Sequence, residues 1–179
     1  MTGQVDDFST YQGAYNIFSK VNCVGNTENC IFGAIVDMSK SASFTGSMIG
    51  EGAFGAAGYV IGGLLGQERD ERVGRIYDYL FALINLTEYG VGIMPLTGSG
   101  GLRFNPANQT PCYDAFIFYR YQELSDISVK KYYGIRKSVR AITLTLVDGN
   151  KLHFNANMVE KTLPYQENGM NAMVNKYGK

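Results

Sequence analysis

The hydrophobic residues near the N-terminus follow a helical spacing. Tyr11, Tyr15 and Phe18 lie three or four positions apart, and residues 31–38 repeat apolar positions at i, i+3, i+4 and i+7. On a helix such positions share one face, which a globular chain buries. The pattern therefore predicts two short helices joined around residues 25–29.

From Ile76 onward the hydrophobic pattern changes to a period of two, which is typical of half-buried β-strands. In the clearest case Ile142, Leu144 and Leu146 alternate with threonines. A long segment that contains glycine and proline, residues 97–113, is expected to be a loop. The predicted strands cover residues 79–86, 91–96, 115–121, 127–133, 139–147 and 151–157.

The last predicted hairpin allows a prediction of register, because directly opposed residues of an antiparallel pair share a face. A two-residue turn would place Leu144 opposite the only histidine, so that an apolar side chain would oppose a polar one. An odd number of connecting residues pairs Leu144 with Leu152 or Phe154 instead. We therefore predict a connection of three or five residues, with Gly149 or Asn150 at positive φ.

The C-terminal segment returns to a helical pattern. Met170, Met173, Val174 and Tyr177 recur at i, i+3, i+4 and i+7, which predicts an amphipathic helix of about three turns. Pro164 marks its start. Six strands followed by this helix predict an α+β fold, in which an antiparallel β-barrel or sandwich is capped by the C-terminal helix.

Residues 41–67 form a glycine-rich stretch with a single charge, Glu51. Small residues recur at every fourth position except Phe54, and on a helix they form a smooth stripe that another backbone can approach closely. The glycines of this stripe are Gly46, Gly50, Gly58, Gly62 and Gly66. Three interpretations stay open: a transmembrane helix, which Glu51 disfavours, an interfacial helix on a membrane, and a helix packed in the protein or against a second copy, which we favour.

The segments 80–96, 116–132 and 140–156, followed by the terminal helix over 165–178, resemble the pleckstrin-homology-like superfold. The resemblance is to bacterial proteins with PH-like or GRAM-like domains, and it rests on strand order and on the Tyr-x-x-Leu-x-x-Ile step that begins at Tyr121. It implies a β-barrel of six or seven strands with one end plugged by the helix. Such domains bind lipid headgroups, peptides or other proteins, so the fold alone does not determine the function.

Composition and the change of hydrophobic period divide the chain into a helical, glycine-rich region, residues 1–74, and a β domain, residues 75–179, which the resemblance identifies as PH-like. One further strand is usual in this family, and residues 75–78 are a candidate for it. The charged connector over residues 67–75 contains i,i+4 pairs of opposite charge, which favour a helix.

Charge is unevenly distributed along a chain of zero net charge. Residues 1–126 hold 13 acidic and 7 basic side chains, whereas residues 127–179 hold 3 acidic and 9 basic ones. Any preference for anions therefore belongs to the last third. Five basic residues lie around one predicted turn there, with Tyr132 and Tyr133 between them: Lys130, Lys131, Arg136, Lys137 and Arg140.

These five residues are candidates for holding a phosphate or a lipid headgroup, although we favour the alternative of a solvated basic hairpin. PH domains carry their phosphoinositide motif in the first hairpin, which is acidic here, so we do not expect specific phosphoinositide binding. Nucleic acid is not an expected partner either, because the net charge is zero and no nucleic-acid motif is present.

The three cysteines, Cys23, Cys30 and Cys112, have no paired C-x-x-C spacing, so the sequence predicts neither a disulfide framework nor a zinc site. The N-terminus is acidic and polar, unlike a signal peptide. We therefore expect a cytoplasmic protein with buried or idle thiols and with no cofactor or metal. Association with a membrane surface is the variant that the basic hairpin and the glycine stripe allow.

The sequence predicts no catalytic residues. His153, the only histidine, falls on the polar face of a strand and is expected to be exposed. Ser99 lacks the spacing of a nucleophile elbow, and turn or capping roles explain Asp114, Glu123 and Asp126. The leading hypothesis is a non-enzymatic binding module whose partner is a protein, a second copy included, or an anionic membrane surface. A small hydrolase that uses Ser99 or these carboxylates is the alternative.

Overall fold

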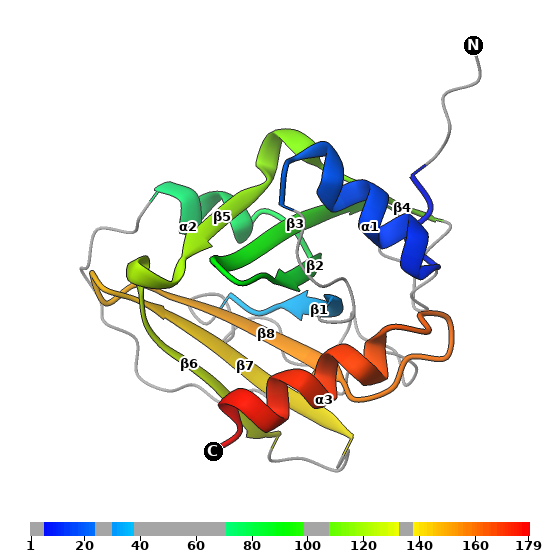
Figure 1. The fold of residues 1–179 in the computed structure, drawn as a ribbon. Coiled ribbons are helices and arrows are strands. Elements are labelled where there is room, and N and C mark those ends of the chain that lie inside the picture. The colour runs from blue at the N-terminus through cyan, green and yellow to red at the C-terminus, as the bar shows by residue number, and fades with distance from the viewer. Residues whose placement is uncertain (1–5, 24–29, 38–70, 99–107, 133–137) are drawn as a thin grey trace.

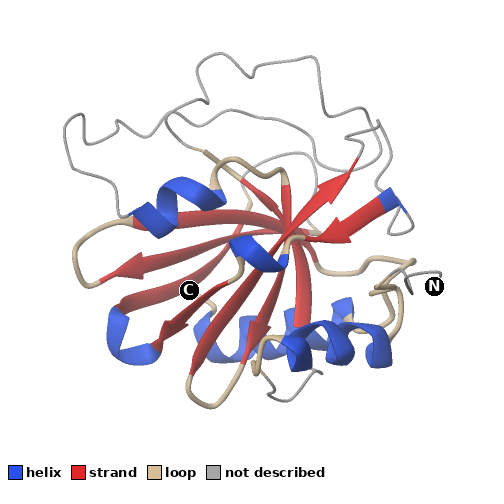
Figure 2. Ribbon diagram, turned by 90° about the horizontal axis from the view of Figure 1, so that it is seen from above, coloured by secondary structure: helices blue, strands red, loops and turns tan. Residues whose placement is uncertain are grey.

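A computed structural model describes residues 6–23, 30–37, 71–98, 108–132 and 138–179 of the chain. It is an α+β structure in which one antiparallel sheet contains all of the described strands (Figure 1). The strand order is β4-β3-β2-β1-β8-β7-β6, and β5 pairs with β3 as well. Seen from above, the strands fan out across the molecule (Figure 2), as the twist of a sheet requires. The elements are α1 (Tyr11–Lys20), β1 (Cys30–Ile35), α2 (Glu71–Ile76), β2 (Phe81–Leu86), β3 (Gly90–Gly98), β4 (Gln109–Pro111), β5 (Ile117–Arg120), β6 (Leu124–Lys131), β7 (Val139–Leu146), β8 (Lys151–Asn157) and α3 (Gln166–Tyr177), with short 3-10 helices η3 (Tyr113–Ala115) and η4 (Tyr121–Glu123).

The first predicted helix is confirmed as α1. Thr10 caps it, because its hydroxyl oxygen accepts the N–H of Gly13 at 3.0 Å and so satisfies one of the free N–H groups of the first turn. Ala14, Ile17 and Phe18 are buried against the outer face of β1, β2 and β3. The helical spacing of the sequence therefore reports a real buried face.

The second predicted N-terminal helix is wrong, because this segment is strand β1. It lies between β2 and β8, with Ile31 opposite Ile84 and Ile35 opposite Phe154. One face of β1 packs under α1 and the other faces the core beneath α3. A strand buried on both faces is a continuous apolar run, which periodicity alone does not distinguish from a helix. The further strand of the sheet is thus β1, whereas Arg75, proposed for that strand, lies in α2.

Strand β3 has an interrupted partner on its outer side. β5 pairs with residues 90–93 and β4 with residues 96–98, and the chain leaves the sheet between them in η3. The interruption lies at Pro95, which has no N–H to offer a neighbouring strand. Its carbonyl accepts the N–H of Cys112 at 2.8 Å. The predicted loop over residues 97–113 therefore contains a short strand.

The register predicted for the last hairpin is confirmed. Leu144 pairs with Leu152, and the apolar faces of β7 and β8 lie together. The N–H of Leu146 donates to the carbonyl of Asn150, which leaves three residues in the connection. Gly149 has φ 89°, a conformation that glycine adopts without strain.

The predicted C-terminal helix is confirmed as α3, which begins two residues after Pro164. Met170 and Met173 are buried in the core that α3 shares with the inner face of the sheet. Gly169 lets the helix approach β1 closely, because a Cβ at this position would lie 2.3 Å from the carbonyl oxygen of Cys30. The helix therefore covers the sheet at a distance that only glycine permits here.

Several predictions concern segments outside the described residues. They include Ser99 and the whole glycine stripe, with Gly46, Gly50, Gly58, Gly62 and Gly66. Within the described ranges, no helix has the length and apolar character needed to cross a membrane. Cys23 and Cys30 are buried thiols and Cys112 is partly buried, and all three are free.

Candidate functional site

The surface around η4 collects the most exposed large hydrophobic side chains of the described chain. Tyr89 is 74% exposed and Val147 is 67% exposed. Both are held next to η4 by backbone hydrogen bonds: the N–H of Tyr121 donates to Tyr89 at 3.1 Å, and the N–H of Val147 donates to Glu123 at 3.0 Å. Two apolar side chains thus flank a short helix where β5 ends and β6 begins.

Cationic side chains from two helices lie over the aromatic rings at this place. The ammonium of Lys176, in α3, is 5.2 Å from the ring centroids of both Tyr121 and Tyr177. The guanidinium of Arg72, in α2, is 4.6 Å from the ring of Tyr119. Each such contact contributes about 0.5–1 kcal/mol when exposed. We call the set Arg72, Tyr89, Tyr121, Glu123, Val147 and Lys176 the η4 surface.

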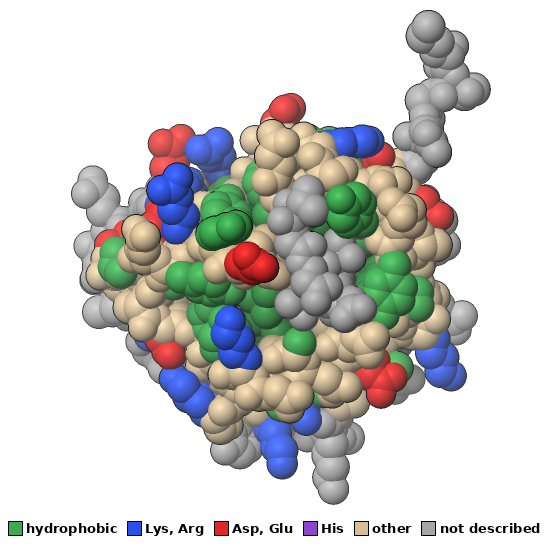
Figure 3. All heavy atoms as spheres, viewed as in Figure 1, with side chains coloured by type: hydrophobic (Ala, Val, Ile, Leu, Met, Phe, Trp, Pro, Cys, Tyr) green, Lys and Arg blue, Asp and Glu red, His purple; other side chains and the backbone are tan. Residues whose placement is uncertain are grey.

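The η4 surface is part of the face seen in Figure 1. Figure 3 shows hydrophobic side chains gathered on this face between α2 and α3, with acidic and basic side chains among them. Large aromatic and apolar groups that water reaches are typical of contact surfaces for other macromolecules. No local sequence pattern marks this surface, because its residues come from α2, the β2–β3 turn, η4, the β7–β8 turn and α3.

The polar groups of the η4 surface form hydrogen bonds with the backbone and with one another. Burial raises the pKa of Tyr121 to about 12, with a further contribution from its hydrogen bond with Tyr177, so the phenol stays neutral. Its hydroxyl donates to the carbonyl of Thr87 at 2.9 Å. Glu123 accepts the N–H of Arg120 and a guanidinium N–H of Arg72, each at 2.9 Å, and these bonds lower its carboxyl pKa.

The carboxylates considered for hydrolysis have separate positions and partners. Asp114 is exposed in η3, and Asp126 forms an ion pair at 2.9 Å with Lys179. Glu123 accepts hydrogen bonds from Arg120 and Arg72 at η4. General acid–base chemistry needs two groups that converge on one substrate. None of the contacts made by these three residues brings a second carboxylate to them within the described part of the chain.

The structure describes three of the five basic residues of the predicted basic hairpin. Lys130 and Lys131 are exposed at the end of β6, and Arg140 is partly buried at the start of β7. Lys131 lies directly opposite Arg140, so these two cations share a face, whereas Lys130 lies opposite Ala141 on the other face. Arg136 and Lys137 fall outside the described residues. The two lysines form no ion pair with any other described residue, and the anion site stays a prediction.

His153 is partly buried, so the prediction of an exposed histidine is wrong. It lies opposite Thr143, and an imidazole nitrogen is 3.1 Å from the hydroxyl oxygen of that residue. Burial lowers the pKa of His153, and the neighbouring charge of Lys151 lowers it further. The hydrogen bond across β7 and β8 explains why this polar side chain tolerates partial burial.

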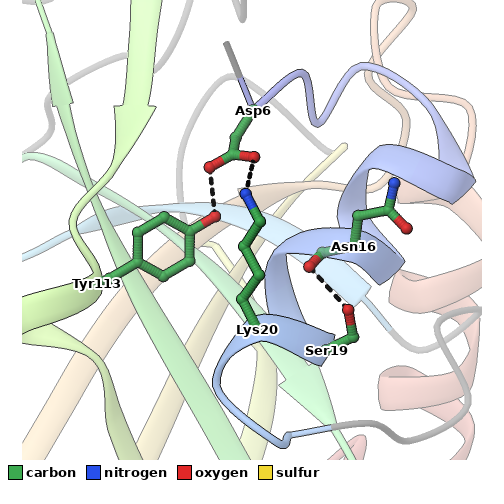
Figure 4. A network of polar contacts seen from close by, with 5 residues as sticks. All are labelled: Asp6, Asn16, Ser19, Lys20 and Tyr113. Carbon is green, nitrogen blue, oxygen red and sulfur yellow. Dashed lines mark hydrogen bonds and ion pairs between the residues drawn. The ribbon is translucent and has the colours of Figure 1, made fainter. Parts of the chain in front are cut away.

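A polar network ties the N-terminal segment to η3 (Figure 4). The carboxylate of Asp6 accepts hydrogen bonds from the phenol of Tyr113 and from the ammonium of Lys20. Burial raises the pKa of Asp6, but these hydrogen bonds and the charge of Lys20 outweigh it, so that the pKa is lowered overall. Because Asp6 and Tyr113 are 107 positions apart, no local pattern could have predicted the contact.

Metal binding finds no support in the described part of the chain, where no three His, Cys, Asp or Glu side chains are grouped so as to hold an ion. Comparison of the chain with protein-family models, with curated proteins and with solved structures finds no match in any of the three.

Proposed function

We propose that the chain is a non-enzymatic binding module with a PH-like fold, and that it engages a protein partner through the η4 surface. The single observation behind this proposal is the exposure of Tyr89 and Val147 on either side of η4. The antiparallel sheet with its C-terminal helix supports the PH-like assignment. A helix over the glycine stripe stays a prediction that accompanies it.

The composition of the η4 surface favours a protein partner. Tyrosine and arginine are enriched at the energetically dominant positions of protein interfaces, because they offer large contact areas and a polar group at one end. Tyr121 and Arg72 are already fixed by hydrogen bonds to Thr87 and Glu123. A partner that docks here therefore loses little free energy in ordering these side chains.

Site-specific photo-crosslinking in cells that express the chain tests this proposal. A photoreactive phenylalanine derivative replaces Tyr89 in one variant and Val147 in another. The control variant carries it at Val159, which is 54% exposed but lies between β8 and α3, away from η4. We expect a discrete protein adduct from positions 89 and 147 and none from 159. Equal adduct patterns at all three positions, or none, would contradict the proposal.

A second candidate is binding to an anionic membrane surface, which the opposed pair Lys131 and Arg140 favours. Two cations on one face can hold the oxygens of one phosphate or headgroup between them. Co-sedimentation with phosphatidylserine-containing vesicles at low salt tests it. Binding that is lost on Lys131→Ala plus Arg140→Ala, but kept on Lys161→Ala, supports this candidate. Equal pelleting with phosphatidylcholine vesicles would refute it.

A further inference from the structure

Two opposite charges beside Tyr121 have no ion-pair partner among the described residues. Glu88 is exposed in the turn between β2 and β3, and Lys176 is exposed near the end of α3. Tyr121 lies between them, because its ring contacts the Lys176 ammonium while its hydroxyl and N–H bind the carbonyls of Thr87 and Tyr89. Residues 87 and 89 are the chain neighbours of Glu88. Among the described residues, the η4 surface thus holds one unpaired cation, Lys176, and an unpaired anion, Glu88, lies at its edge.

We propose that the η4 surface binds a second copy of this chain in a two-fold dimer, in which Glu88 of each copy pairs with Lys176 of the other. This inference rests on the proposed function and names its partner. In a two-fold contact the same patch faces itself, so that every interaction occurs twice. A patch with one unpaired charge of each sign is complementary to itself under this symmetry. Zero net charge also means that two copies do not repel each other over long distances.

The apolar part of the contact comes from Tyr89 and Val147. In the dimer these exposed side chains are covered, while the charged pairs lie at the rim of the contact. The rings of Tyr121 and Tyr177 hold the ammonium of Lys176 in place before a partner arrives. The pair with Glu88 therefore forms with a smaller loss of side-chain freedom than two mobile surface charges would incur.

Sedimentation velocity of the full chain over a concentration series tests this contact. The variants are Glu88→Lys, Lys176→Glu and the double exchange that carries both. Each single exchange places like charges opposite each other twice per dimer, and we expect it to weaken the dimer by about tenfold or more. The double exchange restores the pairs with reversed signs, and the dimer should return to within about threefold of the original affinity. Glu160→Lys and Lys161→Glu are matched controls remote from η4, and circular dichroism confirms folding.

The outcomes separate this inference from the proposed function. A chain that stays monomeric at the highest concentration overturns the dimer, yet adducts with other proteins at position 89 would still support a binding module. A dimer whose affinity is unchanged by both single exchanges overturns this contact and points to another interface, such as the predicted glycine stripe. Weakening by each exchange without recovery in the double variant also overturns the reciprocal pairing. Recovery, together with adducts of the chain with itself at position 89, supports it.

Discussion

Replacing Gln166 should destabilise the fold more than replacing any exposed glutamine, because its side chain forms hydrogen bonds that a neighbouring strand would otherwise provide to β1. β1 and β8 pair only at residues 34 and 35 of β1, so the earlier half of β1 lacks ladder bonds on that side. There the carboxamide of Gln166 accepts the N–H of Phe32 at 2.7 Å and donates to the carbonyl of Phe32 at 3.0 Å. It also donates to the carbonyl of Asn157, the last residue of β8, at 2.8 Å.

The magnitude follows from these three hydrogen bonds. Gln166 is fully buried, so water does not replace the bonds when the carboxamide is removed. A net hydrogen bond contributes roughly 0.5–1.5 kcal/mol, and each buried group left without its partner costs about 1–3 kcal/mol. For Gln166→Met, which keeps a similar volume, we expect the free energy of unfolding to fall by about 3–5 kcal/mol. With a urea dependence of about 2 kcal/mol per molar, the midpoint should fall by about 2 M.

Urea unfolding followed by tyrosine fluorescence and far-ultraviolet circular dichroism measures this midpoint, since the chain has 13 tyrosines and no tryptophan. Gln12→Met is the matched control. Gln12 is exposed on α1, where its carboxamide donates only to the side chain of Asn16. We expect its midpoint to move by less than about 0.3 M. Equal shifts of the urea midpoint in the two variants would show that the backbone hydrogen bonds of Gln166 do not stabilise the sheet.

Three further predictions concern single residues. Gly169→Ala should destabilise the protein by about 2 kcal/mol or more, because the new Cβ would lie 2.3 Å from the carbonyl oxygen of Cys30. Gly74→Ala in α2 should stabilise it by about 0.5–1 kcal/mol, because nothing lies within 4 Å of the new Cβ. Thermal unfolding of both variants measures these effects, and a shift of the same sign in both would contradict the prediction. Because the pKa of His153 is lowered in the folded state, the neutral form is favoured there, and the resulting stability is present above the unfolded pKa of about 6.5 and lost as the pH falls through the folded value. Urea midpoints of the parent should therefore fall more between pH 7.5 and pH 5 than those of His153→Gln, and parallel losses would argue against a burial effect. The pKa of Asp6 is lowered in the folded state, so its charge stabilises the fold above the unfolded pKa of about 3.9, and this stability is lost as the pH falls through the folded pKa. Asp6→Asn should therefore be less stable than the parent at pH 7 and equally stable at acidic pH. A difference in melting temperature that stays constant with pH would contradict this role of the Asp6 network.

The sequence predicts best those elements that expose one face to water. Leu144 and Leu152 alternate with polar residues, and the parity of that alternation was enough to predict a three-residue connection with Gly149 at positive φ. Met170 and Met173 likewise report a single buried face of α3. In both cases apolar side chains that face the core alternate with polar side chains that face water, so the sequence itself shows which face is buried.

Elements buried on both faces give no such contrast. β1 is covered by α1 and by the core beneath α3, so its apolar run has no period that would identify a strand. Contacts between distant segments were missed for another reason. Tyr89, Tyr121 and Lys176 meet only because a turn, a 3-10 helix and the last helix come together, and no short pattern in the sequence marks that meeting.

The central position of β1 also has a consequence for how the chain acquires its structure. β1 is the first of the described strands, but its neighbours on the two sides are β2 and the much later β8, which ends at Asn157. During synthesis one edge of β1 therefore stays unpaired until β8 has been made. Contacts between such distant segments slow folding, because a long loop must close before they form. We therefore expect slow refolding, in which β1 docks late and chaperones that shield an open strand edge raise the yield.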